Sequence, residues 1–152
     1  MNQICSICNK HREQKDMVYQ NEFLYVSHYL PHPDREDNYL GYYFIESKRH
    51  FKGIYDATKE EAIALGLMQR RLALAIKSIP EIDHVYSFVI GEGVDHFHIH
   101  MIGKYRNTPR EYCGPRIDDW PEAPRGDRQD VLELNRRVKD YLQRQIPLLE
   151  AE

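Results

Sequence analysis

Apolar and polar residues alternate across residues 94–102 more regularly than anywhere else in the chain. Three histidines occupy every second position, with bulky apolar residues between them: His96, Phe97, His98, Ile99, His100 and Met101. Side chains of a β-strand alternate between two faces, so the histidines would share one face and the apolar residues the other. A helix would scatter both sets around its axis. The pattern therefore predicts a strand with three imidazoles on one side.

Two other stretches repeat their apolar residues at helical intervals. The first begins at Thr58, where Glu61 has the spacing of a capping box, and ends near residue 78, just before Pro80. Its apolar stripe, which we interpret as core, consists of Ala62, Leu65, Met68, Leu72 and Ile76. The second is a C-terminal helix that begins near Val131 and is expected to end before Pro147.

Shorter apolar runs predict the remaining strands, at residues 17–19, 22–27, 40–46 and 85–90. The first two are close enough to form a hairpin, and 91–93 would turn the last one into the histidine strand. With the two helices, these runs predict an α+β fold: about five mostly antiparallel strands with one long helix packed on them. We expect a single domain over residues 1–152, with an extension at 104–152 made of an irregular segment and the C-terminal helix.

Composition narrows the class of protein. The 152 residues suffice for one domain with its own core, and 30% of them are charged. The net charge of −3 and a pI near 6.2 disfavour general nucleic-acid coating. No apolar run is long enough to cross a bilayer, and residues 1–5 do not read as a signal peptide. Three cysteines, an odd number, fit a reducing compartment, so we expect a cytoplasmic protein.

The spacing of the three histidines indicates divided roles. His96 and His100 would lie about 13 Å apart along a strand, too far to hold one metal ion together. We therefore interpret His98, in the centre, as a candidate nucleophile, with one outer histidine bound elsewhere and the other assisting. The alternative is a surface strand that happens to be rich in histidine. A cluster of titratable residues opposite an apolar face favours a site.

Cysteines and basic residues supply the other candidate chemistry. Cys5 and Cys8, in a Cys-x-x-Cys motif, are half of a zinc site, a redox pair or a coincidence, and His11 is the nearest further ligand. We interpret His28 and His32 as surface residues of a polar loop. Three residues could contact a phosphate, the first through its backbone: Gly93, Lys104 and Arg106.

The motif from His96 to Ile102 resembles the His-φ-His-φ-His-φ-φ signature of the histidine triad (HIT) superfamily in every position, where φ is apolar. The resemblance covers at least residues 5–102. It implies a nucleotide-binding hydrolase or transferase that passes through a nucleotidyl-imidazole intermediate, and it implies a homodimer. Histidine at the third position, where the galactose-1-phosphate uridylyltransferase branch has glutamine, favours hydrolysis.

The resemblance also implies roles for individual residues. His98 would attack the α-phosphorus of a nucleoside phosphoramidate or dinucleoside polyphosphate, and His100 would contact the phosphate or leaving group. The residues in the family's positions for a structural zinc ion are Cys5, Cys8, His50 and His96. An auxiliary histidine of many family members is replaced here by Tyr42, and the irregular segment 107–120, within 107–125, is a candidate for part of substrate recognition. Two alternatives remain, a nucleotide sensor with little turnover and a metallohydrolase that uses His98 and His100 as ligands.

Overall fold

Five antiparallel strands form the central sheet in the order β1-β2-β4-β6-β5. The computed structural model describes residues 5–14, 16–30 and 36–149. The strands of this sheet are β1 (Met17–Gln20), β2 (Leu24–His28), β4 (Tyr42–Ser47), β5 (Ile82–Phe88) and β6 (His98–Tyr105). A separate two-stranded sheet pairs β3 (Asn38–Tyr39) with β7 (Arg125–Gly126). The predicted α+β architecture with five strands is confirmed.

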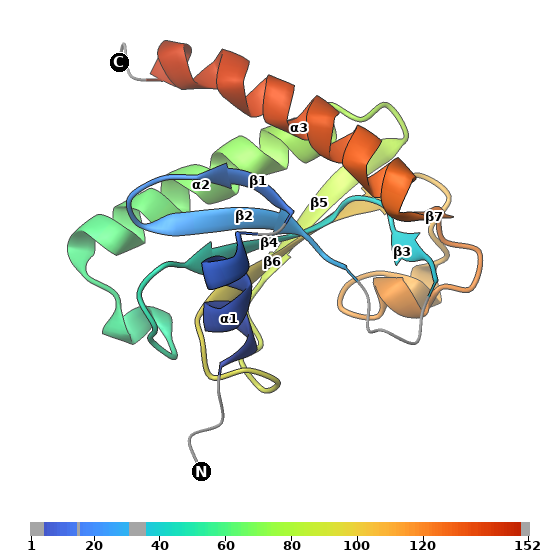
Figure 1. Cartoon of the computed structure of the whole chain (residues 1–152). Coiled ribbons are helices and arrows are strands. Elements are labelled where there is room, and N and C mark those ends of the chain that lie inside the picture. The colour runs from blue at the N-terminus through green and yellow to red at the C-terminus, as the bar shows by residue number, and fades with distance from the viewer. Residues whose placement is uncertain (1–4, 15, 31–35, 150–152) are drawn as a thin grey trace.

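The helices lie on both sides of the sheet (Figure 1). The long helix α2 (Lys59–Lys77) and the C-terminal helix α3 (Arg128–Leu149) cover one face, whereas the short helix α1 (Ser6–Glu13) lies against the other. Short 3₁₀ turns complete the chain: η1 (Ile54–Asp56), η2 (Arg110–Tyr112) and η3 (Ile117–Asp119).

Strand alternation divides the sheet residues between a core face and a site face. The side chains under α2 and α3 are fully or almost fully buried, and they include Leu24, Val26, Tyr43, Ile45, Ile99 and Met101. Their neighbours in β4 and β6 point to the opposite face: Tyr42, Phe44, Glu46, His98 and His100. Burial of the apolar face against the helices therefore fixes the direction in which the two histidines point.

A complete capping box starts α2, as the sequence predicts. The Thr58 hydroxyl accepts a hydrogen bond from the Glu61 backbone N–H, and the Glu61 carboxylate accepts one from the Thr58 N–H. The same carboxylate binds the guanidinium of Arg49 at 2.8 Å. Because Arg49 directly precedes His50, this ion pair anchors the turn that carries His50 to the start of the helix.

Residues 107–125 cover one end of the site face. Ile117, Trp120 and Ala123 pack against Tyr39 and against Ile102 of β6 in a second apolar cluster. The segment is held by Arg125, which donates hydrogen bonds to the backbone and carboxylate of Asp118. The segment therefore packs on β6 beyond His100, at Ile102.

Three sequence predictions need correction. The strand that carries the histidines begins at His98, so His96 lies just before it. The C-terminal helix does not end before Pro147 but extends to Leu149. His28 is buried in β2, where its Nδ1–H donates to the Tyr29 carbonyl and its Nε2 accepts from the Gly41 N–H, so the surface interpretation is wrong. His32 lies outside the described residues.

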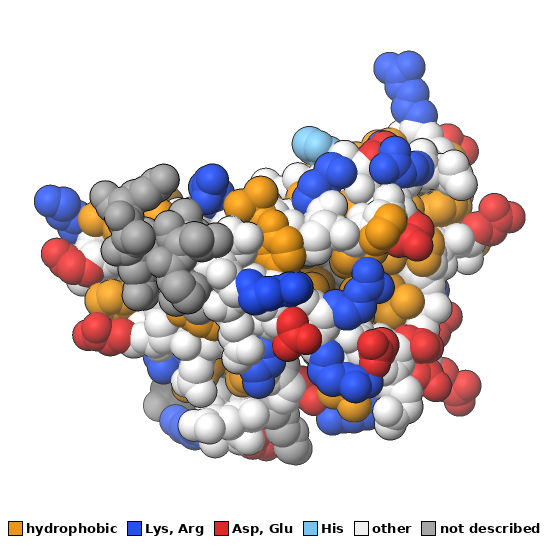
Figure 2. Space-filling view, turned by 90° about the horizontal axis from the view of Figure 1, so that it is seen from above, with side chains coloured by type: hydrophobic (Ala, Val, Ile, Leu, Met, Phe, Trp, Pro, Cys, Tyr) orange, Lys and Arg blue, Asp and Glu red, His pale blue; other side chains and the backbone are white. Residues whose placement is uncertain are grey.

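None of the helices in the described residues is long and apolar enough to cross a bilayer. On the face seen from above the α2 and α3 layer, basic and acidic side chains are interspersed rather than separated (Figure 2). This arrangement agrees with the small net charge of the chain.

Candidate functional site

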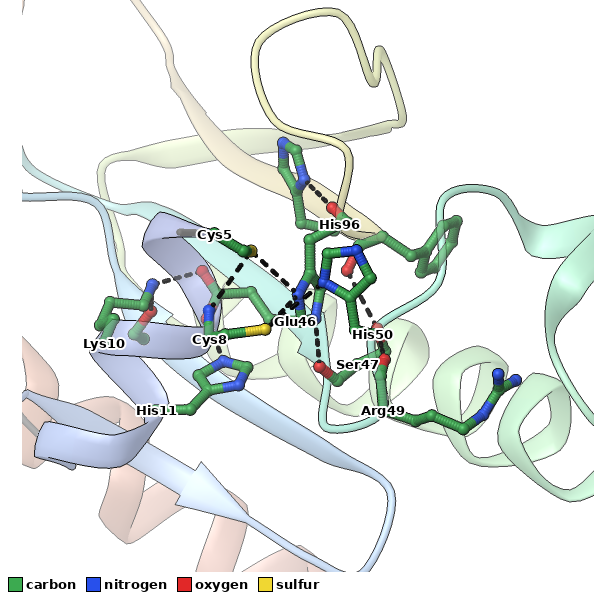
Figure 3. Close-up of polar contacts among 12 residues, drawn as sticks. Cys5, Cys8, Lys10, His11, Glu46, Ser47, Arg49, His50 and His96 are labelled. Atoms are coloured by element: carbon green, nitrogen blue, oxygen red, sulfur yellow. Dashed lines mark hydrogen bonds and ion pairs between the residues drawn. The ribbon is translucent and has the colours of Figure 1, made fainter. Parts of the chain in front are cut away.

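Two cysteines and two histidines meet where α1 approaches the sheet (Figure 3). One ligand atom from each of Cys5, Cys8, His50 and His96 lies within 4.8 Å of the other three. The Nδ1 atom of His96 is 3.4 Å from both sulfur atoms, and the Nδ1 atom of His50 is 3.4 Å from Cys8 Sγ. The four residues that the sequence resemblance groups together are therefore adjacent in space.

The donor atoms of this cluster fit a tetrahedral zinc ion. With Zn–S near 2.3 Å and Zn–N near 2.0 Å, a tetrahedral ion holds sulfur and nitrogen about 3.5 Å apart. The observed separations of 3.4 Å match that spacing. Two thiols and two imidazoles are also a common donor set of closed structural zinc sites. Among the residues that the structure describes, this is the one cluster suited to a metal ion.

A hydrogen bond orients His96 toward the sulfur atoms. Its Nε2–H donates to the Ser47 carbonyl at 2.7 Å, which leaves the lone pair of Nδ1 facing the cysteines. Burial lowers the pKa of His96, and this favours the neutral imidazole that a metal requires. Cys5 is also the N-cap of α1, with its sulfur accepting a weak hydrogen bond from the Cys8 N–H at 3.4 Å.

His11 takes part in a buried ion-pair network instead of the cluster. Its Nε2 is 2.9 Å from a carboxylate oxygen of Glu46, and the other oxygen of Glu46 binds Lys10. Burial alone would raise the pKa of Glu46, but the hydrogen bonds and charges of His11 and Lys10 lower it. His11 also packs edge-on against His96. The network therefore braces α1 against β4 beside the metal cluster.

His98 lines a cleft of about 590 Å³ between α1 and strands β2 and β4. Its Nδ1–H donates to the His96 carbonyl at 2.7 Å, because a carbonyl oxygen can only accept. In the neutral imidazole, the Nε2 atom then carries the lone pair, the form required of a nucleophile. Other side chains that line this cleft are Lys10, Ser27, Tyr29, Phe44, Glu46 and Val94.

His100 sits beside His98 in an aromatic surrounding. The two imidazole centres are 5.1 Å apart, and the Phe88 ring stacks on His100 with centres 4.8 Å apart. The Tyr42 hydroxyl lies 2.7 Å from His100 Nδ1. Burial, with a smaller contribution from His98, lowers the pKa of His100 to about 4. His100 is therefore neutral near pH 7.

Three of the residues predicted to contact a phosphate do not lie next to His98 and His100. Lys104 shares its strand face but lies beyond the buried Ile102, and its Nζ binds Asp83 at 3.1 Å. Arg106 donates to the Pro80 carbonyl at the far end of β6. Gly93 lines a neighbouring hollow with Cys5 and His50. Among the described residues that line the His98 cleft, the lysine or arginine is Lys10, which the sequence prediction did not name.

The sequence carries partial signals for the residues that were missed. Glu46 has the same strand parity as Phe44 and Tyr42, so alternation alone places it on the site face beside His98. The sequence singles out Tyr42 only because it stands where many family members have a histidine. No sequence pattern predicts that Lys10 lines the cleft, because its position depends on how α1 packs on the sheet.

Comparison with known families identifies the chain. Residues 2–111 match the family described as scavenger mRNA decapping enzyme, C-terminal binding. This is well over half of the sequence, and the chain belongs to that family, within the HIT superfamily. A comparison with curated proteins finds no match.

Solved structures share the fold at low sequence identity. A histidine triad nucleotide-binding protein from Sulfolobus tokodaii is 17% identical, with a TM-score of 0.69 and 93% of each chain covered. A zinc-bound histidine triad protein from Mycobacterium smegmatis is 16% identical, with a TM-score of 0.66 and 98% of each chain covered. A HIT-like protein from Bartonella henselae is 15% identical, with a TM-score of 0.64; 93% of this chain and 98% of that one are covered. These similarities establish the HIT-like fold.

Proposed function

We propose that the protein is a nucleotidyl hydrolase that forms a covalent nucleotidyl-histidine intermediate on His98. One observation carries the proposal: His98 lines the cleft with Nδ1–H bound to the His96 carbonyl, which leaves the Nε2 lone pair free. A neutral imidazole held in this tautomer is a good nucleophile toward phosphorus. The substrate class is a nucleoside phosphoramidate or a dinucleoside polyphosphate, with a nucleoside monophosphate as product.

The reaction would proceed through two displacements at the α-phosphorus. His98 Nε2 attacks, a nitrogen–phosphorus bond forms, and the bond from phosphorus to the leaving group breaks; a phosphate leaves with the bonding electron pair, whereas an amine also takes up a proton from solvent. Water then attacks the same phosphorus and loses a proton to solvent, the nitrogen–phosphorus bond breaks, and the nucleoside monophosphate leaves. His100 donates a hydrogen bond to a phosphoryl or leaving-group oxygen as charge develops on it. Lys10 lines the same cleft, where its ammonium is bound by Glu46.

Cys5, Cys8, His50 and His96 would hold a structural zinc ion outside the reaction itself. Bound there, zinc supplies a covalent tie between α1 and the segment that leads into β6. His96 would then serve two purposes, because its side chain is a ligand and its backbone carbonyl orients His98. The zinc-bound relative from Mycobacterium smegmatis agrees with this assignment.

The first test is turnover of a substrate panel by the wild-type protein. The panel contains an adenosine phosphoramidate, a dinucleoside polyphosphate and, because of the family description, a cap-like dinucleoside triphosphate. We expect released nucleoside monophosphate from at least one class, measured by chromatography. Tight binding of nucleotides without any turnover would instead favour the sensor alternative. The metallohydrolase alternative lacks geometric support, since the only described metal-suited cluster excludes His98 and His100.

We also propose that the protein is a homodimer that associates through the β5 edge. This strand has one neighbour in the sheet, β6, and its other side is free among the described strands. Next to that edge, four large apolar side chains are about half exposed or more and line one groove: Ile54, Tyr55, Val89 and Ile90. A cluster of this kind marks a protein–protein contact in many soluble proteins.

Replacing Ile90 by glutamate is expected to convert the dimer into a monomer. The substitution would bury an unpaired charge, and an expected penalty of about 2–3 kcal/mol corresponds to about a hundredfold weaker association. Light scattering behind size exclusion at equal protein concentrations measures the change. Ile63→Glu is the matched control, because Ile63 is 53% exposed but lines a different groove. A monomeric wild type, or a dimer that survives Ile90→Glu, would contradict this interface.

A further inference from the structure

The Tyr42 hydroxyl makes a hydrogen bond with His100 that the proposed reaction does not yet use. Its oxygen lies 2.7 Å from Nδ1 of the imidazole. In the register of the sheet, Phe44 pairs with His100 and Tyr42 pairs with Ile102, so Tyr42 reaches His100 along a diagonal. Aromatic side chains are long enough to span such a diagonal. The contact therefore results from the register of β4 and β6.

The direction of this hydrogen bond follows from the chemistry of the two groups. Burial raises the pKa of Tyr42 well above its usual range, so the phenol keeps its proton. A phenol is a stronger donor than a neutral imidazole N–H, and an imidazole nitrogen is a stronger acceptor than a phenol oxygen. The hydroxyl has no other hydrogen-bond partner in the part of the chain that the structure describes. Tyr42 therefore donates, and Nδ1 of His100 accepts.

A neutral imidazole that accepts at Nδ1 must carry its proton on Nε2. His98 has the opposite tautomer, because its Nδ1–H donates to a carbonyl and its Nε2 is bare. The two adjacent histidines thus differ in chemical character, one presenting a lone pair and the other a donor. Ring contacts from Phe44 and Phe88 hold His100 in place, but among the described residues only the Tyr42 hydroxyl bonds to a ring nitrogen and can select its tautomer.

We propose that Tyr42 is a positioning residue that fixes His100 as the Nε2–H tautomer, so that His100 presents a donor to the phosphoryl or leaving-group oxygen. The inference rests on the proposed hydrolase function and explains how the chain works without the auxiliary histidine of its relatives. Tyr42 itself does not touch the reacting atoms. Its effect on the reaction passes through the orientation and protonation of His100.

The test combines nuclear magnetic resonance with kinetics on Tyr42→Phe. Long-range ¹H–¹⁵N spectra of the labelled wild-type protein near pH 7 report the tautomer of each histidine, and we expect His100 to be protonated on Nε2. In Tyr42→Phe we expect its nitrogen shifts to move toward those of a mixture of tautomers. With the best substrate of the panel, kcat should fall about ten- to a hundredfold while KM changes by less than about threefold.

Tyr105→Phe is the matched control for the loss of a partly buried phenol. Its hydroxyl donates to the Leu40 carbonyl at 2.9 Å and makes no contact with His100. Both variants should show a similar small drop in melting temperature, but only Tyr42→Phe should alter the His100 spectrum and kcat. A wild-type His100 protonated on Nδ1, or a Tyr42→Phe variant with unchanged spectrum and kcat, would overturn the inference. The wild-type spectrum needs no turnover, so the tautomer is decided even if no substrate is hydrolysed.

Discussion

Alanine in place of His98 is expected to reduce turnover by about 10⁴-fold or more, because the atom that bonds to phosphorus is removed. The fold should persist, since His98 is only half-buried and contributes one hydrogen bond to a backbone carbonyl. Nucleotide binding should change by no more than a few-fold. Steady-state release of nucleoside monophosphate and calorimetric binding of a non-hydrolysable analogue measure the two effects separately.

Three further measurements make this result specific to His98. His100→Ala should lower kcat by about 10²–10³-fold, the usual cost of losing one donor to a developing negative charge. His84→Ala, which removes an exposed histidine of β5, should behave as wild type. Acid-labile label from an α-labelled nucleotide should appear on the wild-type protein and be absent from His98→Ala. Turnover by His98→Ala at the wild-type rate would exclude the nucleotidyl-histidine mechanism.

The spacing of apolar residues predicted the fold because, in this chain, residues close together in the sequence determine which side chains are buried and where helices begin. The two-residue alternation in β6 reflects one face packed under α2 and α3, and the sequence showed that alternation directly. The helix start at Thr58 was readable because both halves of a capping box lie within four residues. Pro147 was misleading, since α3 continues past it to Leu149.

The sequence indicated many of the residues that form the site, but less well how these residues are placed relative to one another. Alternation indicates which face a residue lies on, and it correctly places Lys104 on the face of His100. It does not show that Ile102, covered by residues 107–125, separates the two. His96 lies just before the strand, with its ring held between the Ser47 carbonyl and the cysteines, contacts made across the fold. Such long-range contacts have no counterpart in the local sequence pattern.

Replacement of Cys5 and Cys8 together by serine is expected to have the largest effect on stability. The double variant should lose about one equivalent of zinc per chain, because two ligands alone do not close a tetrahedral site. We expect the free energy of unfolding to fall by about 4 kcal/mol, in the range typical of a lost metal site. For a chain of this size that is a drop of roughly 8–16 °C in melting temperature. Elemental analysis and thermal unfolding measure the two quantities.

Cys113→Ser is the matched control, since this third cysteine lies outside the cluster and its thiol is 3.6 Å from the Pro109 carbonyl. It should keep both the zinc and the melting temperature. A strong chelator should bring the wild-type melting temperature close to that of the double variant and should leave the double variant unchanged. His96→Ala should also lose metal and stability, because its ring is a ligand and is buried against Ser47. Full zinc content in the double cysteine variant would refute the assignment, because the remaining pair, His50 and His96, cannot hold the ion alone.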